Sequence, residues 1–99
     1  MSKTIEKGLN ILTLFTEEKP SWRLDELANA TDIPKSTLHR FLKTFTDLRI
    51  LKRPYIQSGS QLVLSDYYLL GNKLIELGAI AANSIEIRSL AIPYATAKI

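Results

Sequence analysis

The sequence has 99 residues, 45% of them hydrophobic, and a formal net charge of +3. This length fits one small domain, and so mild a positive charge permits an anionic partner without requiring one. The absence of cysteine excludes disulfides and thiolate metal sites. No secretory signal follows residues 1–7 and no apolar stretch can span a bilayer, so we expect a cytoplasmic protein that does not contact membranes.

Periodic apolar residues predict a first helix over about residues 4–17, because side chains such as Ile5 and Leu9 recur at steps of three and four. Gly8 lies within this stripe. A glycine there costs about 1 kcal/mol relative to alanine, and it permits the close approach of another helix. The polar run over residues 17–21 predicts a turn.

A pair of helices joined by a tight turn is predicted next. Residues 22–24 form a short strand or an extended bridge, after which we expect Asp25 to cap a second helix that ends near residues 29–31. The turn over residues 31–33 leads to Pro34. This proline suits the first turn of the following helix, where its missing N–H is harmless.

The third helix, over about residues 34–48, has two contrasting faces. An α-helix fits the major groove of DNA, whose base edges present a distinct pattern of donors and acceptors. A helix with one apolar and one basic face can be held by the core while it reads that groove. The apolar stripe comprises Leu38, Phe41, Leu42, Phe45 and Leu48, and the polar face comprises Lys35, Ser36, Thr37, His39, Arg40 and Lys43.

Roles on DNA follow from the chemistry of the polar face. Arg40 is the candidate for a bidentate contact to guanine, and Lys43 is expected to neutralise a phosphate, as is Lys35 unless it reaches a guanine edge. The short hydroxyl donors and His39 can bond a phosphate or a base. Two cations at the base of the following hairpin are placed to meet the adjacent backbone or minor groove. The predicted DNA-binding residues are therefore Lys35, Ser36, Thr37, His39, Arg40, Lys43, Lys52 and Arg53.

A hairpin follows the third helix. Residues 50–53 begin a strand, and residues 57–60 have the chemistry of a turn. We expect residues 67–70 to form the returning strand. Residues 61–64 are a competing choice, or an added strand within a long loop.

A fourth helix is predicted from residue 71 or 72 to about residue 82, and it is apolar on two sides. The first side, which includes Leu74 and Leu77, is expected to pack on its own domain. The second consists mostly of small residues and is expected to contact a second copy of the chain, with ordinary packing inside one domain as the alternative. The residues assigned to this dimer contact are Gly8, Ile75, Gly78, Ala79 and Ala82.

The predicted order of elements is that of a winged helix-turn-helix: a mainly α fold with a small β-hairpin, followed by a linker helix. The run Ile-Pro-Lys-Ser-Thr-Leu-His-Arg-Phe-Leu over residues 33–42 resembles the N-terminal domain of IclR-type bacterial transcriptional regulators. Residues 5–12 resemble the opening helix of that family. Residues 68–71 and 73–78 resemble the returning strand of its wing and its linker helix.

The resemblance implies a partner, an assembly and a larger architecture. It implies that the chain binds double-stranded operator DNA as a homodimer, and some members of the family assemble further. It also implies a C-terminal domain that binds a small-molecule effector and is absent from this chain. We therefore expect residues 1–70 to form the DNA-binding domain, residues 71–83 the linker helix, and residues 84–99 the start of a truncated effector-binding domain. Ser84 is expected to cap a last helix that contains Pro93 as a kink or stop.

Three features depart from the family pattern. Asp32 stands where the turn usually has glycine, but aspartate tolerates a left-handed backbone better than most residues. Arg49 stands where glycine commonly ends the third helix, and a left-handed conformation there costs about 1 kcal/mol. The wing has no lysine or arginine between Tyr55 and Tyr67, which weakens the case for inserting its tip into a groove.

Two other classes of function remain to be compared with DNA binding. A winged-helix module for protein–protein interaction is the alternative, but it would favour apolar or acidic residues on the third helix. An enzyme is not expected, because His39 is the only histidine and no carboxylate orients a Ser36–His39 pair. We expect no metal and no cofactor.

Overall fold

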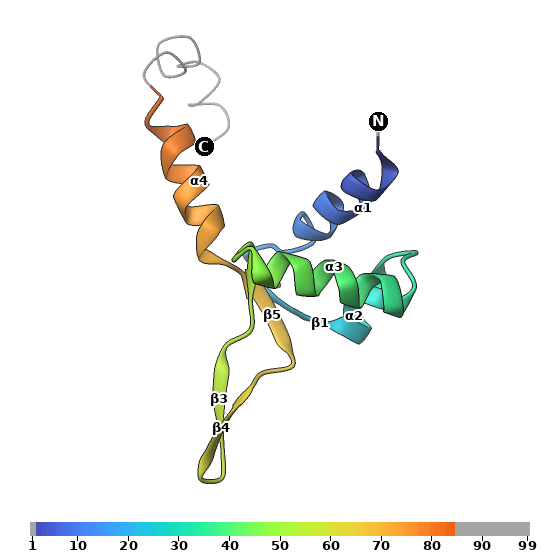
Figure 1. Ribbon diagram of the computed structural model, residues 1–99, viewed down its shortest axis with the longest axis vertical. Helices are drawn as coiled ribbons and strands as arrows, with labels where there is room; N and C mark the ends of the chain where they lie inside the picture. The colour runs from blue at the N-terminus through green and yellow to red at the C-terminus, as the bar shows by residue number, and fades with distance from the viewer. Residues whose placement is uncertain (1, 85–99) are drawn as a thin grey trace.

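A computed structural model describes residues 2–84 (Figure 1). The predicted last helix and Pro93 lie outside these residues. Within them, none of the helices has the length and apolar content needed to cross a bilayer. In chain order the elements are α1 (Lys3–Leu12), β1 (Ser21–Arg23), α2 (Leu24–Ala30), α3 (Lys35–Asp47), β2 (Leu51–Lys52), β3 (Tyr55–Ser58), β4 (Gln61–Leu64), β5 (Tyr67–Leu70) and α4 (Asn72–Ala82).

The first helix is shorter than its apolar periodicity predicts. It begins at the cap of Ser2, whose hydroxyl accepts from the backbone N–H of Ile5, and it ends at Leu12 rather than near residue 17. The hydroxyl of Thr13 donates to the carbonyl of Asn10, 2.7 Å away, which closes the last turn. The chain then turns, and the carbonyl oxygen of Leu14 accepts a hydrogen bond from the side chain of a tryptophan further along the chain.

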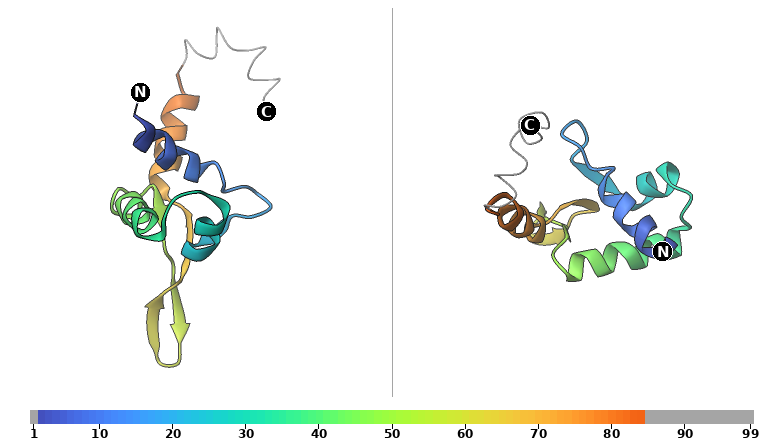
Figure 2. Two further views of the ribbon diagram at one scale, coloured as in Figure 1. Left: turned by 90° about the vertical axis from the view of Figure 1, so that its right-hand side faces the viewer. Right: turned by 90° about the horizontal axis from the view of Figure 1, so that it is seen from above.

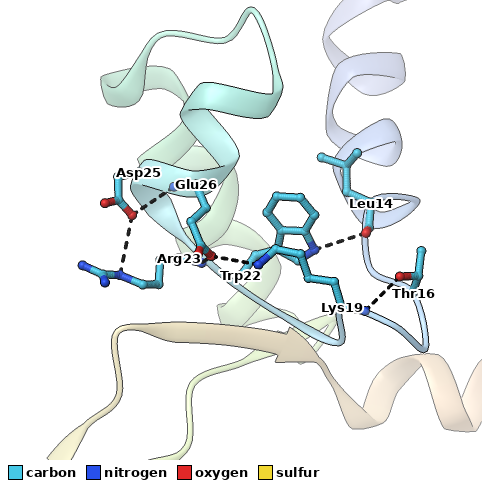
Figure 3. Close-up of polar contacts among 7 residues, drawn as sticks. All are labelled: Leu14, Thr16, Lys19, Trp22, Arg23, Asp25 and Glu26. Carbon is cyan, nitrogen blue, oxygen red and sulfur yellow. Dashed lines mark hydrogen bonds and ion pairs between the residues drawn. The ribbon is translucent and has the colours of Figure 1, made fainter.

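That tryptophan is Trp22, in the middle of β1. Its indole Nε1 donates to the carbonyl oxygen of Leu14 at 3.1 Å (Figure 3). The hydroxyl of Thr16 accepts from the backbone N–H of Lys19 at 3.0 Å and tightens the intervening loop. The bond from Trp22 joins the segment after α1 to β1, and the bond between Thr16 and Lys19 closes the loop between them.

The second helix follows β1 directly, and its cap differs from the prediction. Arg23 is the N-cap, and the carboxylate of Glu26 accepts its backbone N–H at 2.9 Å (Figure 3). This bond is the main cause of the lowered pKa of Glu26. Asp25, predicted as the cap, lies inside the first turn instead. The helix starts earlier because Glu26 reaches back to Arg23, as in a capping box.

The turn between α2 and α3 is built by Thr31. Its hydroxyl donates to the carbonyl of Leu27 at 2.8 Å and accepts from the N–H of Ile33 at 3.3 Å. Asp32 does not have a positive φ, so this departure from the family pattern causes no strain. Pro34 is the N-cap of α3 rather than its first residue, and its carbonyl accepts a hydrogen bond from the backbone N–H of Leu38.

Eight apolar side chains form the core. Leu27 of α2 and Leu38 and Leu42 of α3 have no exposed surface. Residues from α1, β2, β5 and two loops complete the cluster, which therefore joins the three N-terminal helices to the sheet. The core consists of Ile11, Phe15, Leu27, Ile33, Leu38, Leu42, Leu51 and Tyr68.

The strands form two separate antiparallel sheets. In the first, β5 lies between β1 and β2, with Trp22 opposite Tyr68 and Leu51 opposite Leu70. In the second, β3 and β4 form a hairpin that projects away from the helices (Figures 1 and 2). The choice of residues 67–70 as the returning strand is confirmed, and β4 is the added strand that the sequence left open.

The end of α3 and the start of α4 are bonded together, and we call this contact the α3–α4 junction. Arg49 has a φ of 64°, as expected of a helix-ending position usually held by glycine. Its carbonyl accepts from Lys73 N–H at 2.9 Å, and the carbonyl of Ile50 accepts from Gly71 N–H at 2.7 Å. The Arg49 guanidinium also makes two bonds, of 2.8 and 3.2 Å, to the carboxylate of Glu76. The junction therefore fixes where the linker helix begins.

Gly71 is expected to tolerate no side chain. A Cβ at this position would lie 2.3 Å from the carbonyl oxygen of Arg49, whereas a Cβ at Gly78 would have nothing within 4 Å. We expect Gly71→Ala to lower the free energy of unfolding by about 2 kcal/mol or more. The control Gly78→Ala should leave it unchanged or raise it by up to about 1 kcal/mol. Urea denaturation at fixed protein concentration measures both, and equal effects would contradict the tight junction.

Glu76 is expected to make stability depend on acid. The hydrogen bond from Arg49, followed by that from Lys73, lowers the pKa of Glu76 from 4.5 to about 2. The stabilisation is therefore fully present above pH 4.5 and is lost as the pH falls through 2. The pair is exposed, so the effect is small and weakens with salt. As the pH falls from 4.5 to 2, the denaturation midpoints of the wild type and Glu76→Gln should converge. A difference that does not change with pH would contradict the lowered pKa of Glu76.

Candidate nucleic-acid interface

The third helix turns its polar face outward. Leu38 and Leu42 are completely buried, and Phe41 and Phe45 pack at the edge of the core. Leu48, predicted to belong to the buried stripe, is instead 54% exposed at the C-cap. The two faces otherwise match the prediction. On the outer face Lys35, Ser36, His39, Arg40 and Lys43 are exposed, and Thr37 is half-buried.

The charges on this face are unevenly distributed along α3. Its first turn contains no acidic residue. Near its end, the Nζ of Lys43 lies 3.0 Å from a carboxylate oxygen of Asp47, one turn away. The start of α3 therefore presents freer positive charge than its end.

A groove runs between the outer face of α3 and the base of the hairpin. Two clefts make it up, with volumes of about 320 and 300 Å³, and both are lined by His39, Arg53 and Tyr68. The first extends to the start of α3, and the second extends to Lys43. The groove therefore brings Lys35, His39 and Lys43 of α3 together with Arg53. The other predicted residues of α3, which line neither cleft, are Ser36, Thr37 and Arg40.

Arg53 is held in the groove by two contacts. Its Nε donates to the carbonyl of Ser65 at 2.8 Å, and its guanidinium lies 5.4 Å from the ring centroid of Tyr68. Ser65 is itself buried, and its backbone N–H donates to the carbonyl of Pro54 at 2.7 Å. The hydrogen bond between Ser65 and Pro54 at the base of the hairpin thus holds the carbonyl that positions the Arg53 side chain.

The structure does not bring Lys52 to the same groove. In the sheet register Lys52 is opposite Leu69, whereas Leu51 before it is buried in the core. Side chains of consecutive strand residues point to opposite faces. Lys52 accordingly lines a separate hollow with Phe15 and Glu17, and its predicted contact with DNA stays a prediction.

The outer part of the hairpin has no charged side chain, since residues 54–65 contain neither acids nor bases. Its large apolar side chains are exposed, which distinguishes it from the cationic groove. The exposed residues are Tyr55, Ile56, Leu62, Val63 and Leu64.

The residues predicted for dimer contact fall into two groups. Gly8 is buried, and a Cβ there would lie 3.3 Å from the ring of Phe45 in the same chain, so its close approach is intramolecular. On α4 the predicted residues Ile75, Gly78, Ala79 and Ala82 are all exposed. The other side of α4 was expected to pack on its own domain, but Leu77 is 52% exposed and only the first turns of the helix are half-buried.

Two residues of the groove were missed by the sequence prediction. Arg23 and Tyr68 line the cleft at the start of α3, together with Asp25 and Asp66. Both come from strands that approach α3 only in the folded chain, so local periodicity could not reveal them. Among the described residues, no three side chains of the metal-ligating types lie close enough to hold an ion.

Known proteins are similar to this chain in sequence. The chain is similar to the HTH-type transcriptional regulator KipR of Bacillus subtilis (strain 168), with 34% identity over 92 residues, which are 93% of this chain and 33% of KipR. It is also similar to the HTH-type transcriptional regulator XynR of Escherichia coli (strain K12), with 32% identity over 94 residues, which are 95% of this chain and 34% of XynR. The chain thus spans about a third of the length of these relatives.

A solved structure confirms the fold as a winged helix-turn-helix of this kind. The IclR family transcriptional regulator from Brucella abortus matches with a TM-score of 0.70 and 26% identity, over 94% of this chain and 32% of that one. Residues 4–54 match the IclR helix-turn-helix domain. Both relatives are transcriptional regulators by name, and neither is named as an enzyme. The chain belongs to the IclR family and contains its helix-turn-helix domain.

Proposed function

We propose that this chain is a sequence-specific DNA-binding domain that places α3 in the major groove of a regulator's operator. The observation that carries the proposal is the division of α3, whose side chains Leu38 and Leu42 are completely buried while its cations are exposed. The start of such a helix lies nearest the bases. Ser36 and Arg40 are therefore the candidates for reading base edges, with Arg40 bidentate on guanine.

Phosphate contacts surround this reading face. Lys35 and Lys43 lie at the two ends of the exposed side of α3, and Arg53 faces the same groove from the hairpin base. Thr37 and His39 can donate to a phosphate or a base. We leave Lys52 out of this set, because it lies in the other hollow.

Exposed apolar side chains on both sides of α4 support binding as a two-fold dimer. Ile75, Leu77 and Ile80 are 70%, 52% and 69% exposed, and Ile5 and Leu9 of α1 are also more than half exposed. Helices α1 and α4 both extend from the side of the body opposite the hairpin (Figure 1). Apolar helix faces that the domain leaves uncovered are favourable to bury between two copies. A two-fold dimer would present two α3 helices to a pseudo-palindromic operator.

Replacing Arg40 and Lys43 should separate specificity from affinity. Arg40→Ala should relax discrimination at one base position, a loss of about 1–3 kcal/mol there. Lys43→Ala should weaken all duplexes equally and lower the salt slope by up to about 1, whereas Asp47→Asn should strengthen binding because it frees Lys43. Fluorescence anisotropy with a duplex selected from a random library and a scrambled duplex measures all three. A wild-type protein that enriches no duplex from the random library at low salt would favour the protein-interaction module instead.

Replacing Ile80 should test the dimer. Ile80→Glu places a charge on the exposed face of α4, at a side chain that the single domain does not use. We expect the variant to sediment as a monomer and to lose affinity for a palindromic duplex at least tenfold, with little change on a half-site duplex. Glu17→Gln, on the exposed loop after α1, is the control and should alter neither quantity. An unchanged sedimentation coefficient for Ile80→Glu would place the dimer contact elsewhere.

A further inference from the structure

We propose that the cleft at the start of α3 holds one backbone phosphate of the bound DNA, with Arg23 as a contact that the sequence did not indicate. The inference rests on the proposed function and deepens it. Three parts of the chain that are distant in sequence supply the cations: the end of β1, the first two turns of α3, and the segment after β2. The lining comprises Arg23, Leu24, Asp25, Lys35, His39, Arg53, Asp66 and Tyr68, around a volume of about 320 Å³.

The two guanidinium groups are positioned before any ligand binds. Arg23 lies 3.6 Å from a carboxylate oxygen of Asp25 (Figure 3) and 5.9 Å from the ring centroid of Tyr67. Arg53 uses only its Nε for the bond to Ser65, and no hydrogen bond or ion pair within residues 2–84 engages its terminal nitrogens. Guanidinium groups held in this way lose less side-chain freedom when they bind phosphate oxygens.

The charge of the cleft fits a phosphodiester. Arg23, Lys35 and Arg53 contribute three positive charges, and Asp25 and Asp66 contribute two negative ones. The resulting formal charge of +1, with His39 neutral, matches the single negative charge of one link in a DNA strand. The two carboxylates oppose tight binding of a free phosphate dianion, so the cleft is suited to a phosphate that other contacts deliver.

The position of the cleft determines which phosphate it receives. Its members Lys35 and His39 also belong to the outer face of α3, so a duplex bound along that face brings a strand past the cleft. Strands that border the major groove are the usual partners of residues flanking a reading helix. The cleft at the start of α3 therefore lies at the rim of the major groove rather than under the tip of the hairpin.

Charge variants combined with neutral phosphates test the proposal. A series of library-selected duplexes, each with a single neutral methylphosphonate, locates every phosphate that the wild-type chain contacts. Arg23→Gln should reduce affinity for the unmodified duplex about threefold to tenfold and lower the salt slope by about 1. At one particular phosphate, replacement by methylphosphonate should lower the affinity of the wild type but not that of Arg23→Gln. The affinity of Arg53→Gln should be unaffected at the same phosphate. Lys52→Gln, from the opposite hollow, is the charge-matched control and should keep that sensitivity.

Two further measurements keep the result separable from misfolding and from free phosphate. Asp66→Asn should increase affinity for every duplex, which an unfolded variant cannot do, and Arg23→Lys should restore most of the lost affinity. Inorganic phosphate should cause no saturable chemical shift changes at cleft residues up to millimolar concentrations. Saturable binding lost in Arg23→Gln would instead assign the cleft to free phosphate and overturn the proposal.

These experiments distinguish a failure of this inference from a failure of the proposed function. If the wild type binds DNA and Arg23→Gln keeps its salt slope and its full methylphosphonate pattern, the cleft is not a phosphate seat and the proposed function stands. If the wild type binds no duplex, both are wrong.

Discussion

The burial of Leu38 and Leu42 fixes the rotation of α3 about its own axis. Both side chains have no exposed surface, and they pack with Ile11, Leu27 and Leu51 from three other elements. Full burial of one leucine contributes about 1.5–3 kcal/mol, whereas an exposed ion pair contributes about 1 kcal/mol or less. Core packing therefore decides which face of α3 meets solvent. The cationic residues on that face are free to serve a partner, because the fold does not depend on them.

The α3–α4 junction extends this constraint to the linker helix. Because α4 begins on the carbonyls of Arg49 and Ile50, its start cannot move without moving the end of α3. The left-handed backbone at Arg49 costs about 1 kcal/mol compared with glycine, but only a residue with a side chain can also bond Glu76. Any contact made through α4 would thus be transmitted to the position of α3, which links an assembly surface to a reading surface.

Local sequence rules predicted the elements well and the contacts between distant segments poorly. The bounds of α3 and α4 follow from apolar periodicity, whereas the left-handed backbone at Arg49 was suggested only by the family resemblance, in which glycine commonly stands at that position. The end of α1 did not follow, because the bond from Trp22 to Leu14 joins segments that periodicity treats separately. The cap of α2 was misplaced for a different reason: Asp25 and Glu26 are both suitable acceptors, and only the backbone geometry selects Glu26. For the candidate site, the residues of α3 were predictable from one helix, whereas the separation of Lys52 from Arg53 depends on strand register, and the position of Arg23 depends on the folded arrangement of β1, β5 and α3.

On the proposed function, the distribution of cations limits the electrostatic contact that one copy of the chain can make with DNA. The cationic surface consists of Arg23, Lys35, Arg40, Lys43 and Arg53. Of these, Lys43 is paired with Asp47 and Arg23 is paired with Asp25. Residues 54–65 of the hairpin add no charge, so they add no ion pair with phosphate in that direction. Electrostatic affinity grows with the number of phosphates neutralised. A second copy doubles that number and makes the second binding event intramolecular, with a gain of about 10²–10⁴ where the geometry allows both to engage. The exposed apolar side chains of α4, on the side of the body away from the hairpin, are where the proposed pairing would form without obstructing the groove.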